Sequence, residues 1–259
     1  MNLTYERRGS GRPLVMIHGL GGSRRSWDPV ATRLAEQREM ILLDLPGHGG
    51  SAVTPGADSF AGLTDAVAAF LATERLEEAD LVGSSMGARM VLELVRRGHA
   101  GRGVALDPGG FWEGWERHFF AVTIGVSIKL VRLLQPVMPA LAGSPVGRTL
   151  LLTQLSAAPW ALDPAAVLTE MRSFAGTPTF EALTRDLAYG PPQPGIDTLP
   201  GQLTIGWGRQ DLLCLPRQAA RAATRFPGAT LHWFDRCGHF PMWDRPEETV
   251  ELILRATAD

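Results

Sequence analysis

One short stretch, Gly83-Ser84-Ser85-Met86-Gly87, constrains what this chain can fold into. The residues before it, 78–82, form a short run that suits a buried strand, and the residues after it, 89–97, are almost all good helix formers. The two glycines lack a Cβ atom, which allows a strand and a helix to close on each other across a tight bend. The stretch therefore predicts a strand–turn–helix unit that raises Ser85 above a sheet edge, at a helix N-terminus whose field favours negative charge.

The chain up to residue 110 alternates between apolar, strand-like runs and helix-like segments. Besides the unit at Ser85, it contains predicted strands at 3–8, 14–17, 40–43 and 104–106 and predicted helices at 26–35 and 60–73. This alternation is typical of a parallel sheet with right-handed crossovers. We therefore predict an α/β fold with a doubly wound, mostly parallel sheet.

The pattern changes between Phe111 and about Tyr189, where apolar helical segments are broken by prolines and no clear strand is evident. Strands at 203–207 and 230–234 and helices at 216–225 and 247–256 are predicted after it, following a proline-rich linker at 191–195. We predict a helical cap over residues 111–189, inserted into a core made of residues 1–110 and 190–259.

One apolar run in the predicted cap resembles a membrane span but is too short. Residues 119–128 are nearly all apolar, and Lys129, Arg132 and Pro136 interrupt the run well short of the ~20 residues that cross a bilayer. Stable membrane insertion is not expected. Gly125, Lys129 and Arg132 share one helical face, which predicts a cap helix packed on the core with a narrow polar stripe. The alternative is a lid that contacts lipid or an apolar substrate.

Composition narrows the class of protein and its partners. The chain has 259 residues, is 45% hydrophobic and carries a formal net charge of −2, which fits one larger α/β domain and does not indicate a nucleic-acid partner. The N-terminal residues 1–8 lack the apolar segment of a signal peptide. Two cysteines, Cys214 and Cys237, are too few for a disulfide framework. We expect a reduced, cytoplasmic setting, and the oligomeric state stays open.

Four further motifs accompany the unit at Ser85. They are His18-Gly19-Leu20-Gly21-Gly22, the loop Asp-Leu-Pro-Gly-His-Gly-Gly-Ser at 44–51, Gly206-Trp207-Gly208-Arg209-Gln210-Asp211, and Cys237-Gly238-His239-Phe240-Pro241. In this order they resemble the α/β-hydrolase family over the whole chain, cap included. The resemblance implies the α/β-hydrolase fold. A serine stands where haloalkane dehalogenases and epoxide hydrolases of this fold have an aspartate, which points to acyl chemistry.

Residue types and the resemblance together suggest a catalytic triad of Ser85, Asp211 and His239. A serine hydroxyl needs a base to remove its proton, and a histidine titrates near neutral pH. The imidazolium that forms needs a fixed anion on its other nitrogen, which is the expected role of Asp211. Asp107 ends another predicted strand and is the alternative acid.

The resemblance also implies an oxyanion hole built from the backbone N–H groups of Leu20 and Met86. His18 is expected to orient the loop that carries Leu20 rather than to act as a base. No cluster of residues has the spacing of metal ligands, and no Gly-x-Gly-x-x-Gly motif follows a predicted strand. We therefore expect neither a metal nor another cofactor.

Aromatic residues near these motifs are candidates for the walls of a substrate pocket: Phe111, Trp112, Trp115 and Phe240. The predicted activity is that of a serine hydrolase which cleaves carboxylic esters of small to medium apolar molecules through an acyl-enzyme intermediate. The expected partner is a small-molecule ester.

Several alternative activities use the same residues. The Ser-Met-Gly elbow and Trp243 after Cys-Gly-His are similar to enzymes that hydrolyse C–C bonds in ring-cleavage products. The Gly-Leu-Gly-Gly loop departs from the Gly-x-Gly-Pro-Gly of that branch, and no substrate-binding arginine can be assigned. Lactonase, thioesterase and metal-free perhydrolase activities use the same triad, and a ligand receptor of this fold is the non-enzymatic alternative.

Overall fold

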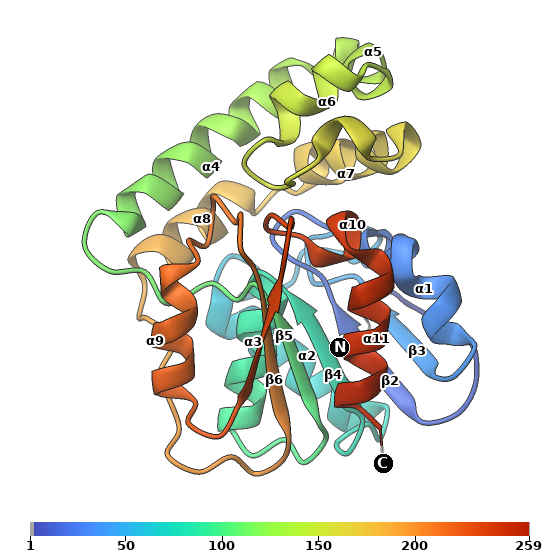
Figure 1. The fold of residues 1–259 in the computed structure, drawn as a ribbon, viewed down its shortest axis with the longest axis vertical. Helices are drawn as coiled ribbons and strands as arrows, with labels where there is room; N and C mark the ends of the chain where they lie inside the picture. Colours follow the sequence, from blue (N-terminus) through green and yellow to red (C-terminus); the bar gives the residue numbers. More distant parts are fainter. Residues whose placement is uncertain (1–2, 259) are drawn as a thin grey trace.

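The computed structural model describes residues 3–258 and contains a seven-stranded sheet with the strand order β1-β3-β2-β4-β5-β6-β7 (Figure 1). Strand β1 pairs with β3 in antiparallel fashion, and all other pairs are parallel. The strands are β1 Tyr5–Arg8, β2 Pro13–Ile17, β3 Glu39–Leu43, β4 Asp80–Ser84, β5 Gly103–Leu106, β6 Leu203–Gly208 and β7 Thr230–Phe234. The predicted fold class, an α/β fold with a mostly parallel sheet, is confirmed.

Helices cover both faces of the sheet, which explains why its inner strands are apolar on both sides. In β2, Val15 and Ile17 belong to one buried cluster with helices α2 and α3, whereas Leu14 and Met16 belong to another with α1 and α11. The core helices are α1 Asp28–Ala35, α2 Phe60–Thr73, α3 Met86–Arg96, α9 Arg217–Arg225 and α11 Pro246–Ala256. Two short helices, η1 Arg24–Trp27 and α10 Pro241–Asp244, lie in loops near the carboxyl ends of the strands.

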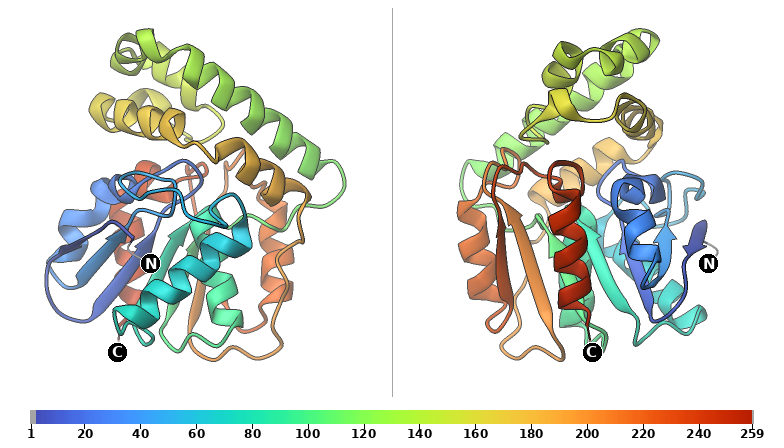
Figure 2. Two further views of the ribbon diagram at one scale, coloured as in Figure 1. Left: turned by 180° about the vertical axis from the view of Figure 1, so that it is seen from behind. Right: turned by 45° about the vertical axis from the view of Figure 1, so that its right-hand side comes forward.

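The segment between β5 and β6 contains only helices in the described chain and lies over the carboxyl ends of the strands (Figures 1 and 2). Its elements are α4 Glu116–Leu133, η2 Gln135–Val137, α5 Met138–Gly143, α6 Pro145–Leu152, η3 Pro159–Ala161, α7 Pro164–Gly176 and α8 Phe180–Tyr189. Five of them, from η2 to α7, begin with a proline at one of the first two positions. Because proline is accepted at a helix start but not in its interior, these prolines divide the segment into short helices.

The two chain crossings between this helical segment and the core lie side by side. The Gln193 N–H donates to the Gly110 carbonyl oxygen at 3.0 Å. The buried Arg89, on α3 directly after the Ser85 turn, donates to the Pro191 carbonyl oxygen at 2.6 Å and to the Gln193 side chain at 3.3 Å. The two chain connections between the helical segment and the core are therefore cross-linked to each other.

No helix of residues 3–258 has, on its own, both the length and the apolar content of a membrane span. Helix α4 and the following residues Gln135–Gly143 reach that length and composition only as a pair, bent by 63°.

Candidate active site

Ser85 sits in a strained turn between β4 and α3. Its backbone has φ 55° and ψ −113°, in the region that non-glycine residues rarely adopt. The flanking glycines make the turn possible, because a Cβ atom on Gly83 would lie 2.2 Å from the Gly87 carbonyl oxygen and one on Gly87 would lie 2.2 Å from that of Ile17. The strain is evidence that the position of the Ser85 side chain matters to function.

Ser85, His239 and Asp211 form a continuous hydrogen-bonded chain. The Ser85 Oγ lies 2.8 Å from His239 Nε2, and His239 Nδ1 lies 2.8 Å from Asp211 Oδ2. The Asp211 Oδ1 accepts hydrogen bonds from the backbone N–H groups of Leu213 and Cys214, at 2.7 Å and 2.9 Å. Because the carboxylate accepts all these bonds, His239 donates from Nδ1 and leaves Nε2 free to accept the serine proton.

Asp107, the alternative acid, lies at the end of β5 and interacts with the backbone of β6 rather than with His239. Its Oδ1 accepts a hydrogen bond from the Gly208 N–H at 2.8 Å. Complete burial, together with the nearby Asp211 carboxylate, raises the pKa of Asp107 well above the ordinary range. Asp107 is therefore suited to remain a neutral acid, whereas Asp211 is the carboxylate in contact with the histidine.

The two residues expected to supply the N–H groups of the oxyanion hole lie near Ser85. Met86 is the first residue of α3, so its N–H has no acceptor within the helix. Leu20 follows β2 and lines the same cavity as Ser85. Gly19 permits this approach, since a Cβ atom there would lie 3.1 Å from the Ser85 Cβ.

His18 holds the start of this loop. Its Nδ1 donates to the Gly19 carbonyl oxygen at 2.7 Å, and its Nε2 accepts from the Leu45 N–H at 3.1 Å. Burial lowers the pKa of His18 to about 4, so the ring is neutral at neutral pH and acts as a fixed support.

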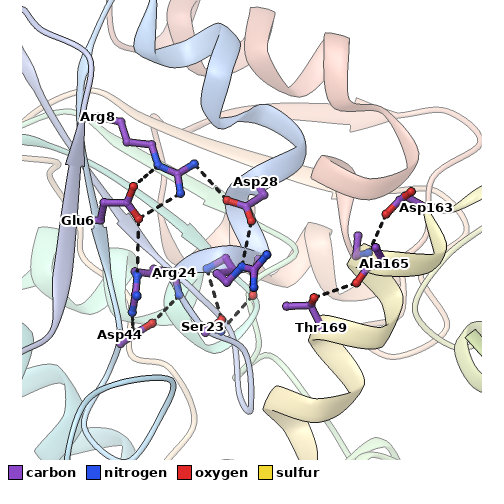
Figure 3. Close-up of polar contacts among 12 residues, drawn as sticks. Glu6, Arg8, Ser23, Arg24, Asp28, Asp44, Asp163, Ala165 and Thr169 are labelled. Atoms are coloured by element: carbon purple, nitrogen blue, oxygen red, sulfur yellow. Dashed lines mark hydrogen bonds and ion pairs between the residues drawn. The ribbon is translucent and has the colours of Figure 1, made fainter. Parts of the chain in front are cut away.

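Asp44 holds the far end of the same loop. The Arg24 N–H donates to Asp44 Oδ1 at 2.7 Å, and the Arg24 guanidinium forms an ion pair with the same carboxylate (Figure 3). The motif loop at 44–51 therefore contributes to the site indirectly, by fixing the loop that carries Leu20.

A cavity that is partly open to solvent extends from Ser85 and His239 into the helical segment. The core contributes residues such as Leu20, Met86, Cys214 and Phe240. The segment between β5 and β6 contributes Trp112, Phe120, Ile124, Ser127, Ile128, Val131, Leu151, Gln154, Leu155, Met171, Phe174, Phe180 and Leu187. None of the described lining residues carries a formal charge apart from the titratable His239 and Cys214. The cavity therefore favours uncharged, largely apolar ligands.

Of the four predicted pocket residues, Trp112 and Phe240 line this cavity, whereas Phe111 and Trp115 do not. Phe111 is fully buried in the core, with its ring centroid 6.4 Å from that of Phe226. Trp115 is 57% exposed and lies on the outer surface, where the Arg217 guanidinium stands 4.9 Å from its ring centroid. The prediction for these two residues is wrong. An aromatic side chain in the stretch between β5 and α4 can point into the cavity, into the core or into solvent, and the sequence does not distinguish these cases.

The sequence analysis missed most of the cavity wall and one acid that frames it. Asp244 accepts hydrogen bonds from the Gly238 N–H at 2.7 Å, from the Ala157 N–H at 2.8 Å and from the Ser156 hydroxyl. The sequence does contain a signal for Asp244, namely an acidic residue only five positions after His239, in what the structure shows as the short helix α10. The signal for the wall was the spacing of Phe120, Ile124 and Ile128 on one helical face.

Asp211, Cys214 and His239 are also of the types that bind metals, and their ligand atoms lie within 4.8 Å of one another. Both Asp211 oxygens already accept hydrogen bonds. Burial raises the pKa of the Cys214 thiol well above its usual value, which disfavours the thiolate that a metal requires. The donor set therefore fits proton transfer better than metal coordination.

Known proteins resemble this chain over nearly its whole length. It is 26% identical over 263 residues to the pimeloyl-[acyl-carrier protein] methyl ester esterase of Aeromonas salmonicida, covering 98% of both chains. It is 22% identical over 278 residues to 2-hydroxy-6-oxononadienedioate/2-hydroxy-6-oxononatrienedioate hydrolase 1 of Dechloromonas aromatica, covering 98% of this chain and 90% of that protein. Among solved structures, a thermophilic esterase from Thermogutta terrifontis shares the fold with a TM-score of 0.75 at 19% identity, covering 98% of this chain and 92% of that one.

The family model "Alpha/beta hydrolase family" matches residues 14–252, which include the Ser85 turn, the loop at Leu20, Asp211 and His239. Given this match and the sheet described above, the chain belongs to the alpha/beta hydrolase family.

Proposed function

We propose that this protein is a serine hydrolase that cleaves carboxylic esters of small to medium, uncharged apolar substrates through an acyl-enzyme intermediate. The observation that carries the proposal is the hydrogen-bonded chain from Ser85 Oγ through His239 to Asp211, with 2.8 Å at each step, at the base of an apolar cavity.

The chemistry follows from these positions. Ser85 Oγ attacks the ester carbonyl carbon while His239 Nε2 takes the hydroxyl proton, and the negative oxygen that forms accepts hydrogen bonds from the Leu20 and Met86 N–H groups. Collapse of this intermediate expels the alcohol, which receives its proton from His239. Water then attacks the acyl-enzyme with His239 as base, releasing the acid and restoring Ser85.

Two considerations favour an ester over the product of aromatic ring cleavage. The uncharged cavity wall offers no cation to a carboxylate, whereas a dioate substrate such as that named for the Dechloromonas relative carries carboxylates. The Aeromonas salmonicida relative, whose match covers 98% of this chain and 98% of its own, is named as a methyl ester esterase. Lactones and thioesters require the same chemistry and stand as variants of the proposal.

A panel of p-nitrophenyl esters with graded acyl chains tests the proposal, with the purified protein and its Ser85→Ala variant measured side by side. We expect turnover that depends on Ser85, and covalent labelling of Ser85 by an alkyl fluorophosphonate. Labelling at another residue would overturn the proposal. It would also be overturned if the protein hydrolysed no ester but did cleave a ring-cleavage dienoate.

A further inference from the structure

Helix α4 is apolar on two opposite faces. One face lines the catalytic cavity with Phe120, Ile124, Ile128 and Val131. The other points outward and carries Val122, Val126, Leu130 and Leu133, which are 61%, 52%, 50% and 74% exposed. The prediction that this helix packs its apolar faces on the core is therefore wrong for the outer stripe. A helix at a protein surface normally turns a polar face to the solvent, so this apolar stripe indicates a contact with another surface.

Exposed apolar side chains continue along the elements that follow α4. Val137 on η2, Val146 and Leu150 on α6, and Trp160 on η3 are all about half exposed or more, and Trp160 borders a shallow surface hollow with Val146 and Leu150. The end of α4 and α5 lie at the edge of the cap farthest from the sheet (Figures 1 and 2). We refer to these exposed apolar residues together as the outer cap face: Val122, Val126, Leu130, Leu133, Val137, Val146, Leu150 and Trp160.

The stretch of sequence that forms the outer cap face carries basic residues and no acidic ones. Between Glu116 and Asp163 the sequence contains no aspartate or glutamate. Lys129 is exposed on α4, three residues after Val126 and four before Leu133, so it lies within the outer stripe. The outer cap face is therefore apolar with a positive charge.

This combination selects among the surfaces that could cover the face. A symmetric contact between two copies would bring Lys129 of each copy to a face that has no carboxylate to pair with it. An anionic phospholipid surface provides both an apolar interior for the aliphatic side chains and negative charge for the lysine, and tryptophan is favoured at such an interface.

We propose that the outer cap face docks on an anionic lipid surface and that the enzyme takes its substrate, an apolar ester, from that surface. One side of α4 carries the lipid-facing stripe and the opposite side forms a wall of the cavity. After docking, only the thickness of this helix therefore separates the cavity from the lipid. The substrate assignment rests on the ester hydrolase proposed above, whereas the docking itself does not.

Flotation with phosphatidylcholine vesicles, with and without phosphatidylserine, tests the docking. We expect the protein to float with the anionic vesicles, and Ser85→Ala to float equally well. The double variant Leu130→Gln/Leu133→Gln and the charge reversal Lys129→Glu should each weaken binding by about tenfold or more. Val53→Gln, which removes a side chain 57% exposed outside the cap, is the matched control and should bind as the wild type does.

Hydrolysis of soluble p-nitrophenyl butyrate should be unchanged in the Leu130→Gln/Leu133→Gln variant, because neither side chain lines the cavity. A wild-type protein that does not float with anionic vesicles refutes the proposal, whatever its esterase activity. If light scattering then shows a dimer that the same double variant dissociates, the outer cap face contacts a second copy instead.

Discussion

Replacement of Glu170 should make the stability of this protein less dependent on pH. Glu170 lies on α7, is 4% exposed, and neither of its carboxyl oxygens has a hydrogen-bond partner among the described residues. It is buried where α7 meets the segment after β2. Asp28 in that segment is already paired with Arg8 at 3.1 Å (Figure 3) and with Arg25 at 3.3 Å. Burial, followed by the Asp28 carboxylate, raises the pKa of Glu170 to about 7, against the opposing effects of Ser26 and Arg25.

The magnitude follows from the two pKa values. The unfolded chain releases the Glu170 proton near pH 4.5, whereas the folded protein retains it to about pH 7. In that window the folded state binds more protons, so its stability falls as pH rises, and the loss is complete above the folded pKa. At 1.36 kcal/mol per pKa unit, the loss is roughly 3 kcal/mol.

Urea unfolding of the wild type and of Glu170→Gln, from about pH 5 to about pH 8, measures this effect. The variant keeps the size of the side chain but cannot ionise, so its free energy of unfolding should exceed that of the wild type increasingly as pH rises. Glu251→Gln, on the exposed side of α11, is the control and should follow the wild type. Parallel pH curves for the wild type and Glu170→Gln would refute the reasoning.

Three further outcomes are expected at the site. Ser85→Ala should lower kcat for a p-nitrophenyl ester by roughly 10⁶ with little change in the melting temperature. Asp211→Asn should cost on the order of 10⁴ in kcat, while Asp107→Asn, which replaces a neutral acid, should cost less than about tenfold; the reverse ranking would reassign the acid. Ile128→Trp should fill the cavity and lower kcat/KM for octanoate more than for acetate p-nitrophenyl esters, and an unchanged ratio would remove Ile128 from the acyl site.

Local chemistry made much of the core predictable. The helix predicted at 60–73 is Phe60–Thr73 in the structure, because the Ser59 hydroxyl caps its start by accepting the Gly62 N–H. The strand predicted at 78–82 is shifted to Asp80–Ser84. Its end is set by pairing of Ser84 with Leu106 on β5, a partner that lies far away in the sequence.

The direction of a side chain in the cap was much less predictable. Trp112 and Trp115 are three residues apart, yet one lines the cavity and the other lies in solvent over Arg217. Glu170 departs from the rule that buried carboxylates are paired, so no pattern in the sequence identifies it. Such features depend on how the helices of the cap lie over the sheet, which residue spacing alone does not determine.

The loop that carries His239 is hydrogen-bonded to the helical segment. The His239 N–H donates to the Leu155 carbonyl oxygen at 2.9 Å, and Asp244 links the Gly238 N–H to the neighbouring Ala157 N–H. Displacement of these residues would remove hydrogen bonds that hold the backbone around the His239 imidazole. Residues 155–157 therefore help to hold the loop that carries His239, the proposed base, and they tie the helical segment to the core at a place far from its two chain connections in the sequence.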